Sequence, residues 1–247
     1  MAPGAAATAA SDLASRLLWV IKLGGSLAGS PHLERWLAVI GGAGAAAIIV
    51  PGGGPFADQV RAAQRRLRFN DSTAHHMALL AMEQYGRMLA GLHPRLQLAA
   101  SRRAIAQTRQ AGSAVVWMPT RMVLDEPRIP ASWDITSDSL AAWLAGQAAA
   151  DRLVLVKSIA LPGETVSATA LADRGIVDPA FPHYVIDSAR EVWCIDDARV
   201  SDMAQALRTG CGAGTRIVPT AVAPASIAGR RRRANIPVEP RGRVQSR

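Results

Sequence analysis

The stretch LWVIKLGGSLAGS, residues 18–30, joins an apolar run that ends at Lys22 to a glycine pair. A short apolar run of this kind predicts a buried strand, and buried strands of parallel sheets carry ligand-binding loops at their carboxyl ends. The pair Gly24 and Gly25 has two interpretations, since glycine serves both phosphate cradles and tight turns. The rest of the chain decides between them.

Five further β-rich apolar runs follow, and helical stretches separate them. This alternation predicts a three-layer α/β/α sandwich with a mainly parallel central sheet. We expect one domain over residues 16–222, with mobile tails at 1–15 and 223–247. The predicted strands cover residues 18–22, 46–50, 114–118, 153–157, 192–195 and 215–218, and the predicted helices cover 31–40, 55–68, 72–91, 101–110, 138–149 and 200–208.

Charge and composition exclude several classes of protein. The formal net charge is +9, but residues 229–247 hold seven arginines against one glutamate and so carry +6 of it. Aromatic residues make up 4% of the chain, which argues against a stacking platform for nucleic acid. The two cysteines form neither a metal spacing nor a disulfide framework. With no apolar run near the roughly 20 residues of a membrane span, we expect a cytoplasmic protein without membrane contact.

Lysine is scarce in this chain. Of the 28 basic residues only Lys22 and Lys157 are lysines, and each closes a predicted strand. A coding preference for arginine accounts for the bias, and it makes the exceptions informative because a compact ammonium and a planar guanidinium are not interchangeable beside a phosphate. We interpret both lysines as taking part in the chemistry of the site. The alternative is that two ordinary lysines have survived by chance.

A second glycine cluster lies in VPGGGPFAD, residues 50–58, between a predicted strand and a predicted helix. Three glycines, Gly52, Gly53 and Gly54, let backbone N–H groups approach an anion, and the helix N-terminus that follows favours negative charge. A tight turn between strand and helix is the alternative. Neither glycine cluster has the spacing of a P-loop or of a dinucleotide-binding motif.

The segment SWDITSDSLAAWLAGQ, residues 132–147, begins another predicted helix. Either Ser137 or Asp138 could cap that helix. Alternatively, Asp138 lies at the mouth of the sheet and orients the lysines, while Trp133 and Asp134 contact a substrate. Spacing alone does not separate these interpretations.

Helix 72–91 carries an apolar stripe that we interpret as core or as a dimer face, with a ligand site as the alternative. The adjacent His75 and His76 point to different sides, so they make a poor metal pair, and spacing suggests no catalytic role for either. The stripe comprises Ala74, Met77, Ala78, Ala81, Met82, Tyr85, Met88 and Leu89.

Together, VIKLGGS, VPGGGPFAD and ITSDSLAAWLA resemble the amino acid kinase family, which includes acetylglutamate, uridylate and isopentenyl phosphate kinases; the likeness spans Trp19 to Val218. Within it, GGGPFAD, MALLAMEQYG, SWDITSDSLA and VDPAFP at 177–182 resemble kinases that act on (5-aminomethyl-3-furyl)methyl phosphate in methanofuran biosynthesis. The resemblance implies transfer of the ATP γ-phosphoryl group to a phosphorylated acceptor, and a homodimer through the Met-rich helix. The segment PFADQV after the second glycine loop lacks the histidine usual in isopentenyl phosphate kinases.

The same resemblance implies a role for each motif. Lys22 and Asp138 would be catalytic, with Asp138 holding the lysine side chains in place; Lys157 joins them as a catalytic residue by the hypothesis given below. Mg²⁺ would arrive with ATP and not in a protein cage, so no metal ligands are expected. The resemblance assigns the ATP phosphates to the backbone of Gly24 and Gly25, and the acceptor to that of Gly52, Gly53 and Gly54. We also expect Ser26 and Ser158 at the ATP phosphates, and Trp133 and Ser137 at the acceptor. An aminated furan should attract a carboxylate near the acceptor loop, for which Asp58 and Asp134 are the candidates.

The chain departs from the family pattern after the strand that ends at Lys157. It reads KSIALPG where many relatives carry an acidic loop, and residues 176–208 lack a later lysine that several relatives use on ATP. Our hypothesis is that Lys157 compensates by reaching the β- and γ-phosphates. The alternatives are a kinase with another acceptor, such as isopentenyl phosphate, uridylate or an acyl amino acid, and a non-catalytic relative that binds a nucleotide or anion.

Overall fold

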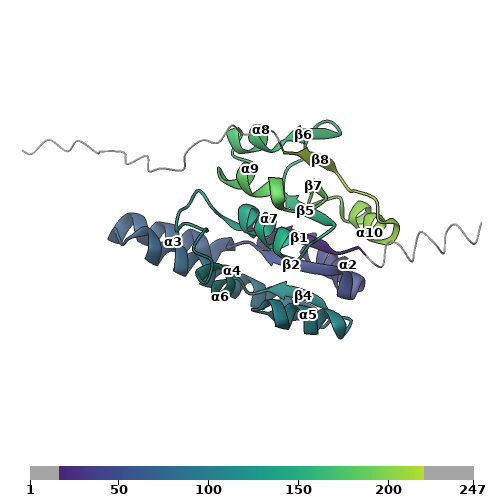
Figure 1. Cartoon of the computed structure of the whole chain (residues 1–247), viewed down its shortest axis with the longest axis horizontal. Helices are drawn as coiled ribbons and strands as arrows, with labels where there is room; N and C mark the ends of the chain where they lie inside the picture. Colours follow the sequence, from purple (N-terminus) through teal and green to yellow (C-terminus); the bar gives the residue numbers. More distant parts are fainter. Residues whose placement is uncertain (1–16, 220–247) are drawn as a thin grey trace, which may run out of the picture.

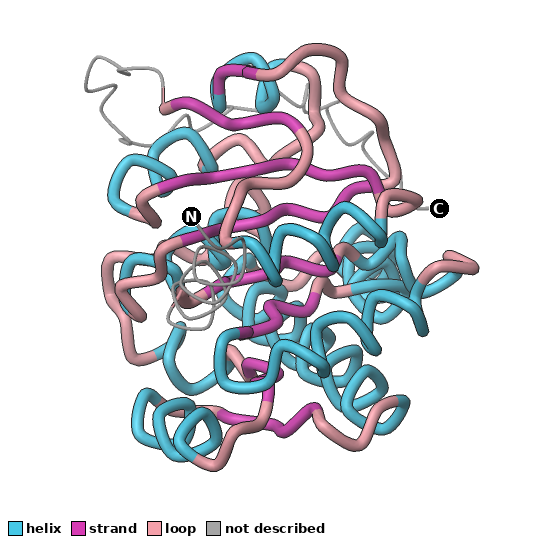
Figure 2. Tube along the Cα trace, turned by 90° about the vertical axis from the view of Figure 1, so that its right-hand side faces the viewer, coloured by secondary structure: helices cyan, strands magenta, loops and turns pink. Residues whose placement is uncertain are grey.

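The computed structural model describes residues 17–219. The tails expected at 1–15 and 223–247 lie outside the described residues, and so do residues 16 and 220–222 at the ends of the expected domain. The described part of the chain forms layers of helices on either side of a sheet, as Figures 1 and 2 show.

The central sheet has eight strands in the order β3-β4-β2-β1-β5-β7-β8-β6. The first six in this order are mutually parallel, whereas β8 is antiparallel to β7 and carries β6 along its outer side. The strands are β1 (Trp19–Leu23), β2 (Ala47–Pro51), β3 (Leu96–Ala99), β4 (Ala114–Trp117), β5 (Arg152–Lys157), β6 (Thr165–Ser167), β7 (Glu191–Asp196) and β8 (Thr215–Val218). The predicted three-layer class with a mainly parallel sheet is confirmed.

Two hydrophobic clusters lie on the two faces of the sheet. Helices α5, α7, α8 and α9 pack into one cluster and α2 and α10 into the other, while α4 contributes to both. The α-helices are α2 (Leu33–Ala43), α3 (Gly54–Leu67), α4 (Asp71–Leu92), α5 (Arg102–Gln110), α6 (Thr120–Leu124), α7 (Ser137–Gln147), α8 (Ala168–Asp173), α9 (Phe181–Tyr184) and α10 (Val200–Thr209); the 3₁₀ helices are η1 (Gly25–Gly29), η2 (Gly44–Ala46) and η3 (Val185–Asp187).

The six predicted strands are all present, each within one residue of its predicted bounds, and the six predicted helices are present within three residues. The prediction missed strands β3 and β6 and helices α6, α8 and α9. Strand β3 buries only Leu96 and Ala99, and β6 has three residues, so neither shows a regular alternation. The three helices have four to six residues, too few for a helical period to be visible.

The stripe predicted on α4 is partly wrong. Tyr85, Met82 and Leu89 are buried as expected, but Met77 is 36% exposed and Leu79 takes a buried place that was not predicted. One side of α4 packs on α3 and another reaches the sheet. A helix that packs on two neighbours buries more than one stripe, which a single-period analysis does not resolve.

Candidate active site

Lys22 and Lys157 lie at the carboxyl ends of two neighbouring strands at the centre of the sheet. In the register of β1 and β5, Lys22 is opposite Leu155, so Lys157 stands two residues further along its strand. Side chains alternate between faces along a strand, and Val20 and Leu155 both point into the cluster that contains α7. Lys22 and Lys157 follow these residues by two and therefore point to the same face.

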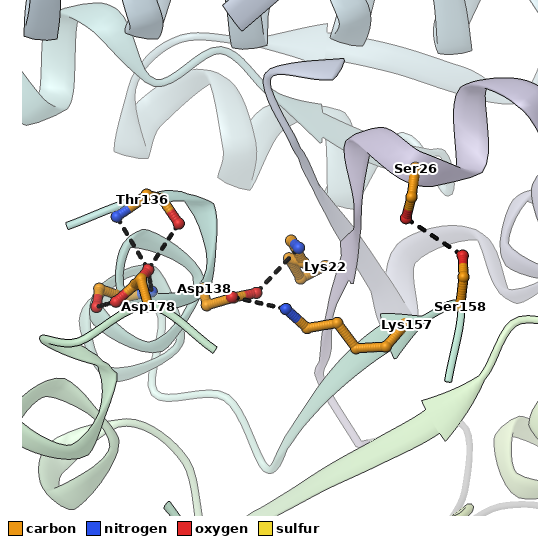
Figure 3. Close-up of polar contacts among 8 residues, drawn as sticks. Lys22, Ser26, Thr136, Asp138, Lys157, Ser158 and Asp178 are labelled. Atoms are coloured by element: carbon orange, nitrogen blue, oxygen red, sulfur yellow. Dashed lines mark hydrogen bonds and ion pairs between the residues drawn. The ribbon is translucent and has the colours of Figure 1, made fainter. Parts of the chain in front are cut away.

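Both ammonium groups meet the carboxylate of Asp138, the second residue of α7 (Figure 3). Lys22 Nζ forms an ion pair with Asp138 Oδ1 at 2.9 Å, and Lys157 Nζ donates a hydrogen bond to Asp138 Oδ2 at 2.7 Å. The side chains of Lys22 and Asp138 are buried, and that of Lys157 is 14% exposed. One carboxylate thus holds two lysines from two strands.

The charges of this triad depend on one another. Burial alone would raise the pKa of Asp138, but the two lysine charges, Lys22 foremost, hold it below its usual value. Burial lowers the pKa of Lys22 against the attraction of Asp138, and the nearby charge of Lys157 lowers it further. The first turn of α7 also favours the carboxylate because a helix N-terminus attracts negative charge. With one carboxylate for two ammonium groups, the triad carries one excess positive charge.

The two glycine loops touch each other beside this triad. A Cβ atom added to Gly25 would lie 2.4 Å from both N and Cα of Gly54, and one added to Gly52 would lie 2.5 Å from N of Gly25. One added to Gly24 would lie 3.2 Å from Lys22 Nζ. Side chains at these positions would therefore push the two loops apart or crowd the buried ammonium.

The loops after β1 and β5 also approach each other. Ser158 Oγ donates a hydrogen bond to Ser26 Oγ at 3.2 Å, and both residues are exposed. Gly54 begins α3 with φ +56°, a conformation that glycine adopts at little cost. Its backbone leads into a 14-residue helix whose N-terminus faces the same edge of the sheet. Backbone N–H groups of this kind can hold phosphate oxygens.

A cavity of about 660 Å³ opens next to the glycine loops. Helices α3 and α4 and the segment before α7 form its walls. Seven of the predicted site residues line the cavity: Gly25, Ser26, Gly53, Gly54, Asp58, Trp133 and Ser137. The remaining lining residues are Ala28, Gly29, Pro55, Ala57, Arg61, Asp71, His75, Ala78, Leu79, Met82, Ser132, Ile135, Thr136 and Leu140.

Residues 18–160 match the model of the amino acid kinase family. This chain belongs to the amino acid kinase family. The matched part contains all three residues of the triad and both glycine loops. The expectation drawn from the sequence motifs is therefore confirmed at the level of the family.

One relative in this family is (5-(aminomethyl)furan-3-yl)methyl phosphate kinase of Methanocaldococcus jannaschii, which is 28% identical to the chain over 130 residues. The match covers 51% of this chain and 58% of that protein, so the chain spans little more than half the length of this relative. Most of the motifs quoted above fall in the family-matched region, residues 18–160.

Two solved structures show the same fold. Uridylate kinase of Archaeoglobus fulgidus superposes with a TM-score of 0.63 at 15% identity, covering 82% of this chain and 100% of its own. N-acetylglutamate synthase of Neisseria gonorrhoeae, in complex with coenzyme A and L-arginine, superposes with a TM-score of 0.57 at 20% identity, covering 87% and 65%. At these identities the likeness concerns the fold alone. Within residues 17–219, no helix combines the length and the apolar composition that crossing a bilayer requires.

The structure bears on two predictions about the site, and it corrects the one that concerns the cap of α7. Asp134 is exposed and does not line the cavity, because the chain turns there: its N–H donates to Ser132 Oγ and its carbonyl accepts from Ala180 N. Neither Ser137 nor Asp138 caps α7, since the N-cap residue is Thr136 and its own side chain makes no capping hydrogen bond.

Sequence reasoning missed three ionisable residues of the cavity, Arg61, Asp71 and His75. Asp71 and His75 are four residues apart on α4, so they share the helix face that looks into the cavity. That spacing was visible in the sequence, but the interpretation of this helix rested on its apolar stripe. Burial lowers the pKa of His75, with a further contribution from His76.

Trp133 is held in place over the cavity by α3. Its Nε1 donates to Gln64 Oε1 at 2.6 Å, and the Arg61 guanidinium lies 4.3 Å from the centre of its ring. Gln64 in turn donates to Asp71 Oδ1 at 2.9 Å. The aromatic ring is thus positioned by two residues of the neighbouring helix.

Proposed function

We propose that this member of the amino acid kinase family transfers the γ-phosphoryl group of ATP to a small phosphorylated acceptor. The carrying observation is that two lysine ammonium groups share the buried carboxylate of Asp138 beside two touching glycine loops. Phosphoryl transfer depends mainly on alignment and on stabilising the charge of the transferring group. A fixed pair of ammonium groups and backbone N–H donors supplies both.

In the proposed reaction, an oxygen of the acceptor phosphate forms a bond to the γ-phosphorus, and the bond from that phosphorus to the ADP oxygen breaks. The products are a diphosphate and ADP. Lys22, whose ammonium lies over Gly24, neutralises charge on the transferring group. Asp138 keeps both ammonium groups in place without reacting itself.

The ATP phosphates would lie along the loop after β1, at the backbone N–H groups of Gly24 and Gly25 and the hydroxyl groups of Ser26 and Ser158. The contact between these two hydroxyl groups supports the assignment, because it places both loops at one site. Lys157 would reach the β- and γ-phosphates from the end of β5. Mg²⁺ bound to the nucleotide would supply further positive charge for the phosphates, since it prefers phosphate and water oxygens.

The acceptor would occupy the cavity between α3, α4 and the segment before α7. Its phosphate would meet the backbone of Gly52, Gly53 and Gly54 at the N-terminus of α3, and its organic part would lie toward Trp133. A volume of about 660 Å³ suits a small molecule.

The acceptor that we propose is (5-aminomethyl-3-furyl)methyl phosphate, as in methanofuran-type cofactor biosynthesis. The name of the Methanocaldococcus jannaschii relative gives this compound as its substrate. The cavity offers matching chemistry: Asp58 and Asp71 attract an ammonium group, and the ring of Trp133 stacks on a flat aromatic ring. Asp134, the other carboxylate predicted for the amine, lies outside the cavity.

A non-catalytic role is the second candidate. One of the similar folds belongs to an N-acetylglutamate synthase, so the fold alone does not make a kinase. The loop KSIALPG after Lys157 carries no carboxylate and is largely exposed. Failure to bind ATP would favour this candidate, whereas turnover with any acceptor would exclude it.

The test is ADP release with ATP, Mg²⁺ and a panel of acceptors: the aminated furan phosphate, isopentenyl phosphate, uridylate and acetylglutamate. We expect the furan phosphate to give the highest kcat/KM. Asp58→Asn should raise the KM for the aminated acceptor at least tenfold, because an amide does not attract the ammonium group. Asp134→Asn is the matched control and should leave the KM unchanged. Turnover of another acceptor alone would reject the furan proposal but keep the kinase.

We further propose that two copies associate through the region of α4. Met77 and Leu80 of this helix are 36% and 43% exposed, which leaves apolar surface for a second copy to cover. Sedimentation of the purified protein at several concentrations tests this proposal, and a monomer throughout would contradict it.

A further inference from the structure

Asp178 lies between α8 and α9 and is only 7% exposed. Its carboxylate accepts four hydrogen bonds from the chain around the start of α7 (Figure 3). Oδ2 accepts from Thr136 N at 2.9 Å, from Thr136 Oγ1 at 2.8 Å and from Ser139 N at 3.0 Å, and Oδ1 accepts from Ser139 Oγ. The motif VDPAFP, which contains Asp178, had no role in the site described above.

These contacts cap the N-terminus of α7 with a side chain that belongs to neither the helix nor its flanking residues. The first N–H groups of a helix lack partners within it, and a local side chain normally supplies one. Thr136 does not do so here, and Asp178 satisfies Thr136 N and Ser139 N instead. The direction of the first turn of α7 is therefore set by a carboxylate about 40 residues further along the chain.

That first turn carries the residue that holds the lysines. Asp138 lies between Thr136 and Ser139, and its two oxygens contact Lys22 and Lys157. A shift of the turn would move both oxygens relative to two ammonium groups that are fixed at strand ends. Among residues 17–219, Asp178 forms no hydrogen bond or ion pair with either lysine, and its charge acts on Lys22 only through space, as the smallest of the influences on the pKa of that lysine.

A carboxylate is a costly choice for a cap at this place. Burial, and next the neighbouring charge of Asp138, raise the pKa of Asp178. A serine or asparagine would satisfy N–H groups without placing a second negative charge near the first. Asp178 accepts four hydrogen bonds from Thr136 and Ser139, two of them from their hydroxyl groups. These four bonds fix the first turn of α7 more fully than a single capping hydrogen bond does.

We propose that Asp178 is a positioning residue, which fixes the first turn of α7 and through it the Asp138 carboxylate that aligns Lys22 and Lys157. Its effect on turnover rests on the proposed kinase function. The alignment of the lysines does not, and it can be measured separately.

The first measurement uses the scarcity of lysine. Protein labelled with ¹³C at lysine Cε gives two signals, from Lys22 and Lys157, which Lys157→Arg assigns. We expect Asp178→Ala to move both signals by more than a line width. Asp178→Asn should leave them nearly in place, because its carbonyl oxygen can accept the three bonds of Oδ2. Asp173→Ala, which removes an exposed carboxylate of the same segment, is the matched control and should change nothing.

The second measurement is kinetic and uses whichever acceptor turns over. We expect Asp178→Ala to lower kcat at least tenfold with the KM for ATP within twofold, and Asp178→Asn to restore kcat to within threefold of wild type. Asp178→Glu keeps the charge but displaces the carboxylate, so it should resemble the alanine variant. When Asp138→Asn is already present, adding Asp178→Ala should lower kcat by less than a further twofold, because the residue through which Asp178 acts is already changed.

Unmoved lysine signals in Asp178→Ala would overturn the proposal whether or not the protein is a kinase. So would an asparagine variant as impaired as the alanine variant, or a glutamate variant that behaves like wild type, since either would mean that charge and not position matters. If Asp178→Ala does not fold, the asparagine and glutamate variants decide the question by themselves. An absence of turnover with moved lysine signals would reject the kinase and keep the positioning role.

Discussion

At the scale of single residues, the site depends on two lysines that an arginine-rich chain has kept. Both end on Asp138, and the more buried of them, Lys22, is surrounded closely enough that a methyl group at Gly24 would approach its Nζ to 3.2 Å. A planar guanidinium is larger than an ammonium and needs a different set of partners. The choice of lysine at position 22 is thus explained by space and charge together.

We predict that Lys22→Arg lowers kcat by about 10²–10³-fold, the range seen when one preorganised charge-stabilising donor is lost. The guanidinium would not fit between Gly24 and Asp138, so the transferring group would lose its nearest charge. Steady-state ADP release measures this. Lys157→Arg is the matched control, and because its side chain is partly exposed we expect it to keep at least a tenth of the activity. Equal losses in the two variants would show that burial does not distinguish the lysines.

At the scale of elements, the site forms where two strand-to-helix connections touch. The loop from β1 into η1 and the loop from β2 into α3 meet at Gly25 and Gly54, and parallel pairing of β1 and β2 brings them to the same edge of the sheet. Backbone lies against backbone at this contact. A side chain there has no flexible neighbour to displace.

We predict that Gly25→Ala reduces activity at least 100-fold and lowers the free energy of unfolding by about 1–3 kcal/mol, as overpacking does. The added Cβ would lie 2.4 Å from N and Cα of Gly54, so the two loops would have to separate. Kinetics and denaturant melts measure the two effects. Gly42→Ala on α2 is the control, since a Cβ there meets nothing within 4 Å and the residue does not line the cavity, and it should behave like wild type. An active Gly25→Ala protein would disprove the close contact.

At the scale of the whole molecule, the two cysteines report on the core. Cys194 on β7 is buried in the cluster that contains α7, whereas Cys211 lies in an exposed segment before β8. Burial raises the pKa of the Cys194 thiol to about 11. At pH 8, therefore, the folded protein presents little Cys194 thiolate, and layers of helix and sheet cover it.

We predict that a thiol reagent at pH 8 modifies one cysteine per chain quickly and the second only at the rate of unfolding. In Cys211→Ser, native protein should react slowly and denatured protein at once, because the thiolate is the reactive form. Raising the pH toward 11 should speed the reaction of the native protein, because the Cys194 thiol ionises more readily in the unfolded chain than in the fold, where its pKa is about 11, and the fold therefore loses stability. The absorbance of the group that the reagent releases on reaction follows both the fast and the slow modification. Rapid modification of native Cys211→Ser would contradict the burial of β7.

The site was partly predictable because its main residues occur at strand ends and helix starts, which leave local patterns. Glycine clusters after apolar runs marked the two loops, and the scarcity of lysine singled out Lys22 and Lys157. Asp134 was predicted to contact the acceptor but does not line the cavity, since the direction of a loop residue three positions before a helix is not fixed by the sequence. His75 was passed over because the apolar pattern of α4 dominated its interpretation.

The sequence by itself determined the α/β class and the six main strands, because alternation of apolar runs and glycine-bearing turns is a local property of the chain. Its three motifs carried the resemblance to the family. Only the tertiary structure decided which charges meet. The register of β1 and β5 placed both lysines on the face of α7, and the capping of α7 by Asp178 joins residues 39 and 42 positions apart. Contacts over such separations follow from packing and leave no periodic signal in the sequence.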